Sequence, residues 1–266
     1  MFFLLHNFLP NPVLFHYGII TIYWYGLFIV LGIISALILI LSLAKKFDID
    51  SEKIWDLSFY LVLFGIIGAR VYEIFLEWPY YSSHPTQIIK IWEGGLAIHG
   101  ALIAGAITLF FFIKKNKLNF WQLMAIVTPG LALGQALGRF GNWFNQELFG
   151  LPTNLPWGIP IALENRPLAF INQEFFHPTF LYESVGSLLI AILLFTLLNR
   201  QKNNLTKKVA MRVGACYLFL YSLLRFFLEF IKVDVTPIFL GLRWPQVISL
   251  IIIVIAIIIY KKSSHA

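Results

Sequence analysis

Seven stretches of this 266-residue chain stay apolar for about 20 residues each, the length that an α-helix needs to cross a bilayer. Only 12% of the residues are charged, whereas soluble domains carry roughly 25%. In hydrocarbon the backbone polar groups must bond to one another, which favours helices. The sequence therefore predicts an all-α polytopic membrane protein, one integral membrane domain over 1–266, with spans at 19–44, 54–76, 94–113, 121–140, 178–198, 209–231 and 244–260.

Basic residues gather in alternate connections between these spans. One set holds 13 of the 20 Lys and Arg residues, namely Lys45, Lys46, Lys53, Lys114, Lys115, Lys117, Arg200, Lys202, Lys207, Lys208, Arg212, Lys261 and Lys262. The opposite set holds Lys90, Arg166, Lys232 and Arg243. Because positive charge marks the cytoplasmic side, we expect the N-terminus outside and the C-terminus in the cytoplasm. The net charge of +7 then reflects topology and contact with anionic lipid, not nucleic-acid binding.

Several ionisable residues lie inside the spans, where a charge is costly and usually functional. At about 1.5 Å per helical residue, His99 would be roughly 8 Å inside the outer end of its span. Tyr25 falls at a similar depth, and Arg139, Arg225 and Glu229 fall in the outer halves of theirs. We expect one polar cavity that opens to the outer leaflet.

Arg139 is followed by Asn142, Asn145 and Glu147. A guanidinium beside asparagine amides suits a phosphate, because it offers a planar fork of donors and a permanent charge. The alternative is an arginine at a helix end that reaches to lipid headgroups. The asparagines favour the first interpretation, a clamp in which the guanidinium and the amides bind a phosphate, since asparagines are costly in lipid unless they are hydrogen-bonded.

Glycines recur at every fourth position before this group, at Gly130, Gly134 and Gly138, and would let a neighbouring helix approach closely. The helix is expected to end at Gly141-Asn142. The segment that follows, about 141–177, is polar and rich in proline and glycine. Its length suggests a lid or substrate-docking loop on the outside, and the alternative is a passive connection.

Tyr217, Tyr221, Arg225 and Glu229 stand four residues apart and so share one helix face. Arg225 and Glu229 could simply neutralise each other. A second cationic site, held by Glu229 and capped by Tyr221, is the interpretation that we favour, because a self-cancelling pair is still costly to bury.

The remaining polar residues give weaker signals. His99 is either a structural histidine or an acid–base group. For His177 and Pro178, with Tyr182 and Glu183 after them, we expect helix capping and packing. Arg70 and Glu73 are three apart and could pair. The histidines lack HxxxH-type spacing and Cys216 is the only cysteine, so the spacing gives no support for a metal site.

Two other classes of protein were considered. A lipid or anion transporter would place polar groups at the membrane midplane, often in repeated halves. An intramembrane protease would need a nucleophile or an aspartate pair at depth. The chain shows no such pair and no evident repeat.

The run GRFGNWFNQELFG (Gly138 to Gly150) resembles the signature of the prolipoprotein diacylglyceryl transferases, Gly-Arg-x-Gly-Asn-x-x-Asn-x-Glu-x-x-Gly. Four further blocks agree in order, namely YWYGL from Tyr23, GGLAIHG from Gly94, HPTFLYES from His177 and the stripe from Tyr221 to Glu229. The LRWPQ stretch before the last span departs from the Met-Gly-Gln often seen there.

The resemblance implies a bacterial cytoplasmic-membrane enzyme that moves a diacylglyceryl group from phosphatidylglycerol to the lipobox cysteine of a preprolipoprotein. A thioether forms, glycerol 1-phosphate leaves, and no cofactor takes part. By the resemblance, Arg139 and Asn142 hold the lipid phosphate, and Arg225, oriented by Glu229 and Tyr221, stabilises the leaving phosphate. His99 is the candidate base. Tyr25, Asn145, Glu147 and Gly150 would contribute to the lipid site.

Overall fold

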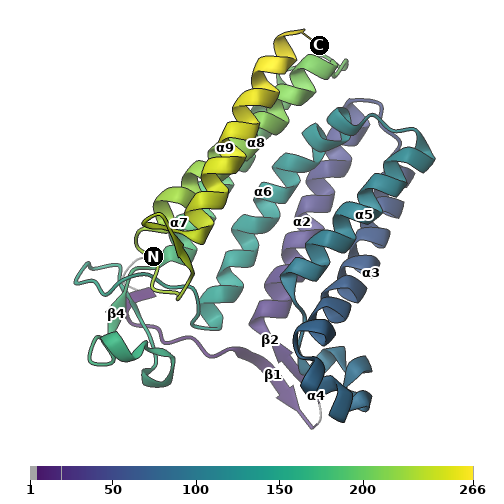
Figure 1. The fold of residues 1–266 in the computed structure, drawn as a ribbon. Helices are drawn as coiled ribbons and strands as arrows, with labels where there is room; N and C mark the ends of the chain where they lie inside the picture. The colour runs from purple at the N-terminus through teal and green to yellow at the C-terminus, as the bar shows by residue number, and fades with distance from the viewer. Residues whose placement is uncertain (1–4, 19, 266) are drawn as a thin grey trace. The chain divides into compact units, whose positions relative to one another are not determined.

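The computed structural model describes residues 5–18 and 20–265 (Figure 1). These residues include seven helices long and apolar enough to cross a membrane, as the sequence predicts. They are α2 (Trp24–Lys46), α3 (Ser51–Leu76), α5 (Ile98–Asn116), α6 (Phe120–Phe144), α7 (Thr179–Asn199), α8 (Lys207–Leu228) and α9 (Trp244–Lys262). The protein is therefore an all-α, multi-pass membrane protein.

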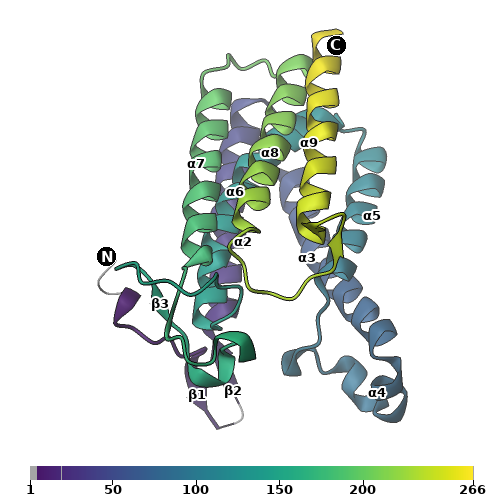
Figure 2. The same ribbon diagram turned by 60° about the vertical axis from the view of Figure 1, so that its left-hand side comes forward.

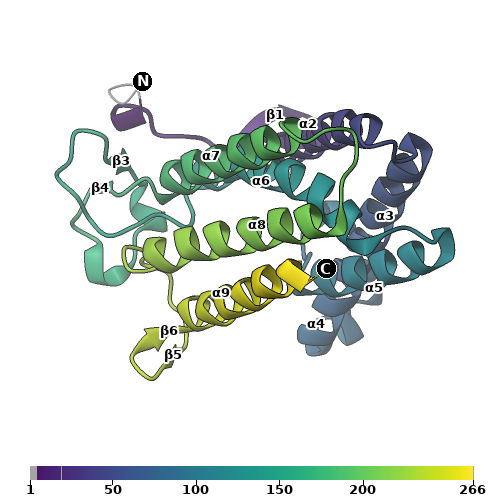
Figure 3. The same cartoon turned by 90° about the horizontal axis from the view of Figure 1, so that it is seen from above.

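The chain divides into two compact units. The first contains the described residues up to Leu43 and from Met124 onward, and the second runs from Ala44 to Leu123. In the first unit α8 packs against both α7 and α9 (Figure 3). The end of this unit at which α6 and α8 finish and α7 and α9 begin is called the site end below (Figure 2).

Small residues bring α6 and α2 together within the first unit. A Cβ atom at Gly32 would lie 3.0 Å from the carbonyl oxygen of Gly134, and one at Gly130 would lie 2.8 Å from that of Ala36. The predicted role of the glycine repeat is thus confirmed at Gly130 and Gly134. At Gly138 a Cβ would make only an ordinary contact, 3.8 Å from Ile29.

The segment between α6 and α7 folds over the site end. It contains the short pair β3 (Ile159–Pro160) and β4 (Phe175–Phe176) and two 3-10 turns, η3 (Leu163–Asn165) and η4 (Leu168–Phe170). Its apolar core includes Phe149, Ile161 and Phe176 and continues onto Phe180 of α7. This core gives the segment a defined fold of its own.

The second unit pairs α3 with α5. A Cβ at Gly68 would lie 2.6 Å from the carbonyl oxygen of Gly100, so the two helices approach closely there. Along the chain, α3 is joined to α5 through α4 (Trp78–Ser83) and the 3-10 helices η1 (Pro85–Ile89) and η2 (Ile91–Glu93). None of these three is long enough to span a membrane.

Several predicted helix ends were wrong, including the following three. The first helix was expected from residue 19, but β1 (Val13–Tyr17) and β2 (Ile20–Tyr23) form an antiparallel hairpin before it, turning at Gly18 with φ of +59°. The third was expected from Gly94, but Gly94 and Gly95 have φ of +95° and +72°, so α5 begins at Ile98. The fourth was expected to end at Gly141-Asn142, but α6 continues to Phe144.

Candidate active site

Glu183 is the centre of a cationic cluster at the site end of the first unit. Its side chain is 1% exposed, and its Oε1 atom accepts a hydrogen bond from Arg139 Nη2 at 2.6 Å. Oε2 accepts one from Arg225 Nη1 at 2.8 Å and lies 3.8 Å from Lys232 Nζ. One carboxylate thus faces three cations from three parts of the chain. A buried charge is tolerated when it is paired and hydrogen-bonded in this way.

Arg139 lies in the last turns of α6 with its guanidinium turned toward α7. Its Nη1 atom donates to Asn142 Oδ1 at 3.0 Å, and Asn142 in turn donates to Glu147 Oε1 at 2.7 Å. Because α6 continues past Asn142, the two side chains are one turn apart on the same helix. Arg139 therefore belongs to a hydrogen-bonded network with Asn142 and Glu183.

The predicted stripe on α8 shares one face, but its partners differ from those expected. Tyr217 donates to Gln135 at 3.1 Å, and the hydroxyl of Tyr221 donates to Glu183 Oε1 at 3.1 Å. Arg225 is hydrogen-bonded to Glu183, whereas its Nη2 atom is 3.5 Å from Glu229 Oε2. The expectation that Glu229 and Tyr221 orient Arg225 was thus incomplete: Glu183 is its nearest anion, and Tyr221 binds that anion.

Glu229 follows the last residue of α8 and is also buried. Its Oε1 atom forms an ion pair with Arg243 Nε at 3.2 Å. Its buried Oε2 atom has no hydrogen-bond partner among the described residues. Glu229 therefore lies between two arginines, one on α8 and one at the start of α9.

Lys232 is the third cation of the cluster and is buried to 6% exposure. Burial, together with the positive charge of Arg225, lowers the pKa of Lys232 to about 8. The backbone of Lys232 is held in place by an isolated antiparallel β-bridge to Gly150. Gly150 also donates its N–H to the carbonyl of His177 at 2.9 Å. A Cβ at Gly150 would lie 2.9 Å from the carbonyl oxygen of Ile231 and 2.7 Å from His177 Cβ. The close approach of these backbone segments leaves no room for a side chain at Gly150, the last residue of the signature run.

Tyr25 and Asn145 lie beside the same end of α6. A Cβ at Gly141 would lie 2.8 Å from the ring of Tyr25, so this glycine allows the tyrosine to pack closely against α6. Asn145 is half-buried, and its backbone N–H continues the helical pattern to Gly141 at 3.0 Å. Gln146 is buried, accepts from the N–H of Ala162 at 2.7 Å and donates to the carbonyl of Pro10 at 2.8 Å. Through these two hydrogen bonds, Gln146 fixes the position of the segment after α6.

His177 packs at the start of α7, but the expected capping role was wrong, because no side chain caps that helix. Its Nδ1 atom lies 3.1 Å from the hydroxyl of Tyr182, which also accepts a hydrogen bond from Trp157 at 2.8 Å. Burial lowers the pKa of His177. This group braces the start of α7, next to Glu183.

His99 belongs to the second unit. It is exposed in the first turn of α5, with its ring 6.0 Å from that of Tyr72. It thus lies nearer the helix start than the 8 Å predicted from a helix beginning at Gly94.

Arg70, also in this unit, does not form the simple pair with Glu73 that we considered. Its guanidinium donates to Tyr81 at 2.9 Å and to the carbonyls of Gly94 and Gly95 at 2.9 and 2.7 Å, and further bonds reach the carbonyls of Gln87 and Ile88. The turn that precedes His99 is therefore anchored by Arg70.

Residues that could bind a metal are not grouped together. Within 5–18 and 20–265, no three His, Cys, Asp or Glu side chains lie close enough to hold an ion. The donors at the site end are guanidinium, ammonium, amide and phenol groups. Such donors suit an anion.

Comparison with known proteins identifies the family. The family model described as prolipoprotein diacylglyceryl transferase matches residues 12–261. The chain belongs to the prolipoprotein diacylglyceryl transferase family. Among its curated relatives, the protein from Nostoc sp. (strain PCC 7120) is 45% identical over 91% of this chain and 85% of its own. The protein from Synechococcus elongatus is 42% identical over 94% of this chain and 86% of its own. Both are named phosphatidylglycerol–prolipoprotein diacylglyceryl transferase, and this chain is accordingly a transferase.

Three residues of the diacylglyceryl transferase cluster were missed or undervalued in the sequence. Glu183 was expected to cap and pack, and Lys232 and Arg243 were counted only as loop charges. Lys232 could have been found, because Arg225, Glu229 and Lys232 follow the i, i+4, i+7 spacing of one helix face. Glu183 and Arg243 gave no such signal, since their partners come from other helices.

Proposed function

We propose that this chain transfers the diacylglyceryl group of phosphatidylglycerol to the lipobox cysteine thiol of a preprolipoprotein. The names of its curated relatives include both substrates. The observation that carries the proposal is the cluster of Arg139, Arg225 and Lys232 around Glu183. Among the described residues, Arg225 makes one side-chain hydrogen bond, which leaves donors for a phosphate.

In this reaction the cysteine sulfur attacks the glycerol carbon that carries the phosphodiester. The carbon–oxygen bond breaks, a thioether forms, and glycerol 1-phosphate leaves with the bonding electron pair. Negative charge grows on the leaving phosphate, so fixed cations beside it lower the barrier. We assign binding of the lipid phosphate to Arg139 and Asn142, and stabilisation of the leaving phosphate to Arg225 with Glu229 and Tyr221.

The thiol proton must pass to a base, because a free thiol has a pKa of about 8.5. His99 is our candidate for that base. Tyr25, Asn145, Glu147 and Gly150 would shape the headgroup site, and the segment 141–177 would act as its lid. We expect the reaction to use no cofactor.

We place the protein in the bacterial cytoplasmic membrane with the site end toward the outer leaflet. At the opposite end of the same unit, Arg200 follows α7, Lys207 and Lys208 begin α8, and Lys261 and Lys262 finish α9. Positive charge at that end supports a cytoplasmic location for it. The C-terminus would then be cytoplasmic and the N-terminus external.

The test is a transfer assay with purified protein, phosphatidylglycerol and a fluorescent lipobox peptide with one cysteine. A matched peptide with serine in place of that cysteine is the control. The proposal predicts a mass gain of one diacylglyceryl group on the cysteine peptide alone, with glycerol phosphate released. No mass gain by folded protein that binds the lipid would contradict it and favour lipid transport instead.

A further inference from the structure

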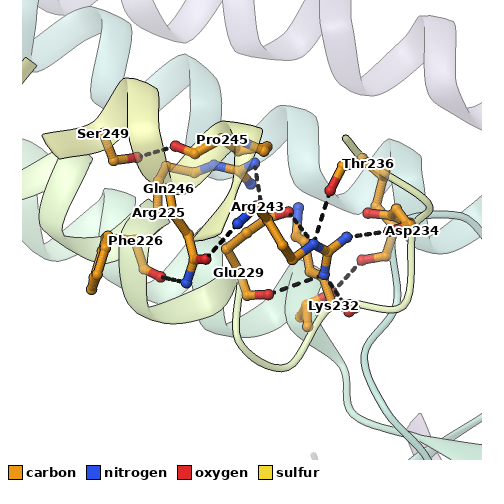
Figure 4. Close-up of polar contacts among 12 residues, drawn as sticks. Arg225, Phe226, Glu229, Lys232, Asp234, Thr236, Arg243, Pro245, Gln246 and Ser249 are labelled. Carbon is orange, nitrogen blue, oxygen red and sulfur yellow. Dashed lines mark hydrogen bonds and ion pairs between the residues drawn. The ribbon is translucent and has the colours of Figure 1, made fainter. Parts of the chain in front are cut away.

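Arg243, the last residue before α9, makes an unusually complete set of contacts (Figure 4). Its guanidinium donates to the carbonyl oxygens of Glu229 at 3.0 Å and Lys232 at 2.5 Å, and also to that of Asp234. It donates to Thr236 Oγ1 at 2.9 Å and forms the 3.2 Å ion pair with Glu229. One side chain thus binds the backbone that follows α8 at three points and neutralises the buried carboxylate there.

The surrounding backbone fixes Arg243 itself. β5 (Ile238–Phe239) pairs with β6 (Leu242–Arg243) across a tight turn at Leu240 and Gly241, where φ is +50° and +78°. The buried side chain of Gln246 accepts from the backbone N–H of Arg243 at 3.0 Å. The hairpin and the start of α9 therefore fix the backbone of Arg243, from which its guanidinium makes the contacts described above.

Neutralisation of Glu229 matters because Arg225 has two carboxylates within reach. Its Nη1 atom is bonded to Glu183 at 2.8 Å, and its Nη2 atom is 3.5 Å from Glu229. A buried carboxylate that lost its counter-charge would attract the nearest cation strongly. Without Arg243, Glu229 would draw Arg225 away from Glu183 and occupy its remaining donors.

We infer that Arg243 is a positioning residue for the transfer reaction. It holds Glu229 and the backbone of Lys232 so that Arg225 stays beside Glu183 with donors free for the leaving phosphate. This inference rests on the proposed function. Arg243 acts through Glu229 and is not assigned a contact with the substrate.

A second arginine offers a matched control. Arg212 joins the other ends of α8 and α9, where its Nε donates to Ser263 at 3.2 Å and its guanidinium lies 5.3 Å from the ring centre of Tyr260. It connects the same two helices without any contact to Glu229 or Arg225 among the described residues. Loss of a purely structural connection can therefore be measured separately.

The experiment compares Arg243→Met, Arg243→Lys and Arg212→Met in the transfer assay, with thermal unfolding of each purified variant. We expect Arg243→Met to lower kcat about 10- to 100-fold, because small displacements at a reacting centre are costly, with a much smaller change in KM for the lipid. Lysine should restore only part of the rate, since an ammonium cannot make the same set of planar contacts. Arg212→Met should lower the unfolding temperature and leave kcat unchanged.

The double variant Arg243→Met/Glu229→Gln separates positioning from simple support. If Arg243 acts through Glu229, its removal should matter little once the carboxylate is an uncharged amide. The kcat of the double variant should then be at most about threefold below that of Glu229→Gln alone. If the reductions in kcat of the two single variants multiply in full in the double variant, the inference is overturned. A folded Arg243→Met variant with wild-type kcat would overturn it as well. An inactive wild-type protein would overturn the proposed function as well, whereas these outcomes with an active wild type leave that function intact.

Discussion

The guanidinium of Arg139 meets the carboxylate of Glu183 at 2.6 Å, although the residues are 44 positions apart. The contact joins the end of α6 to the start of α7 and is charge-assisted, hence stronger than a neutral hydrogen bond. The same carboxylate binds Arg225, so Glu183 sets the separation of the two arginines that we assign to the phosphate.

Arg139→Lys should abolish most of the transfer activity. Lysine keeps the charge, but a single ammonium cannot bond Glu183 and Asn142 with the planar geometry of the guanidinium. We expect kcat/KM to fall by about 100-fold or more, the cost of one lost donor set at a developing oxyanion. The transfer assay with the cysteine peptide measures it. Turnover like that of wild type would remove Arg139 from the proposed clamp.

Glu183→Gln should lower both stability and activity. The amide has nearly the same size, but it leaves Arg139, Arg225 and Lys232 without their shared anion. Breaking a buried pair on one side costs about 3–5 kcal/mol, so thermal unfolding should begin at a clearly lower temperature. Glu174→Gln, on the segment between α6 and α7, is the control and should unfold like wild type. Equal unfolding temperatures for the two variants would show that Glu183 does not hold the cluster together.

The sequence predicted the helices and the stripe from Tyr217 to Glu229, because apolar length and i, i+4 spacing are local properties, whereas the signature was recognised by its resemblance to the family. It also grouped Arg139 with Asn142, Asn145 and Glu147, and the structure joins Arg139, Asn142 and Glu147 by hydrogen bonds. It could not show that Glu183 binds both arginines, since that depends on how α6, α7 and α8 pack. The hairpin before Trp24 was missed for a related reason: Ile20–Tyr23 directly precedes the apolar helix and was assigned to it, and only pairing with Val13–Tyr17 makes it a strand.

Gly150→Ala should damage the site although Gly150 has no side chain to contribute. The new methyl group would lie 2.7 Å from His177 Cβ and 2.9 Å from the carbonyl of Ile231, so the backbone leading to Lys232 must shift. We expect a loss of about 1–3 kcal/mol in the free energy of unfolding, as for other overpacked positions, and reduced transfer. Gly214→Ala is the matched control: its Cβ meets nothing within 4 Å, and alanine favours the helix. Similar behaviour of the two variants would contradict the close-packing argument.

The activity should fall as pH rises through about 8 if the charge of Lys232 contributes to phosphate binding. The pKa of Lys232 is lowered to about 8, so above that pH the buried amine is mostly neutral. An unfolded lysine has a pKa of about 10.4, and between these values the unfolded chain binds more protons. The contribution of Lys232 to the free energy of unfolding therefore increases with pH in this window. Activity and stability should change in opposite directions.

Lys232→Arg provides the measurement, because arginine stays charged throughout this range. The pH–rate profile of this variant should lack the decline near pH 8, whereas Lys90→Arg, at a half-buried lysine paired with Glu93, should keep the wild-type profile. A decline near pH 8 that persists in Lys232→Arg would assign it to another group of the enzyme.

His99→Gln distinguishes a base from a scaffold. His99 is exposed at the start of α5, and glutamine can replace its hydrogen bonding but cannot accept the thiol proton. If His99 is the base, kcat should fall about 10²- to 10⁴-fold, with a changed pH dependence and little effect on unfolding. His84→Gln is the control, since His84 is an exposed histidine of the same unit that bonds Ser83 and the carbonyl of Tyr80. Transfer by His99→Gln with the wild-type pH profile would exclude His99 as the base, and the proton would then have to leave through another group or through water.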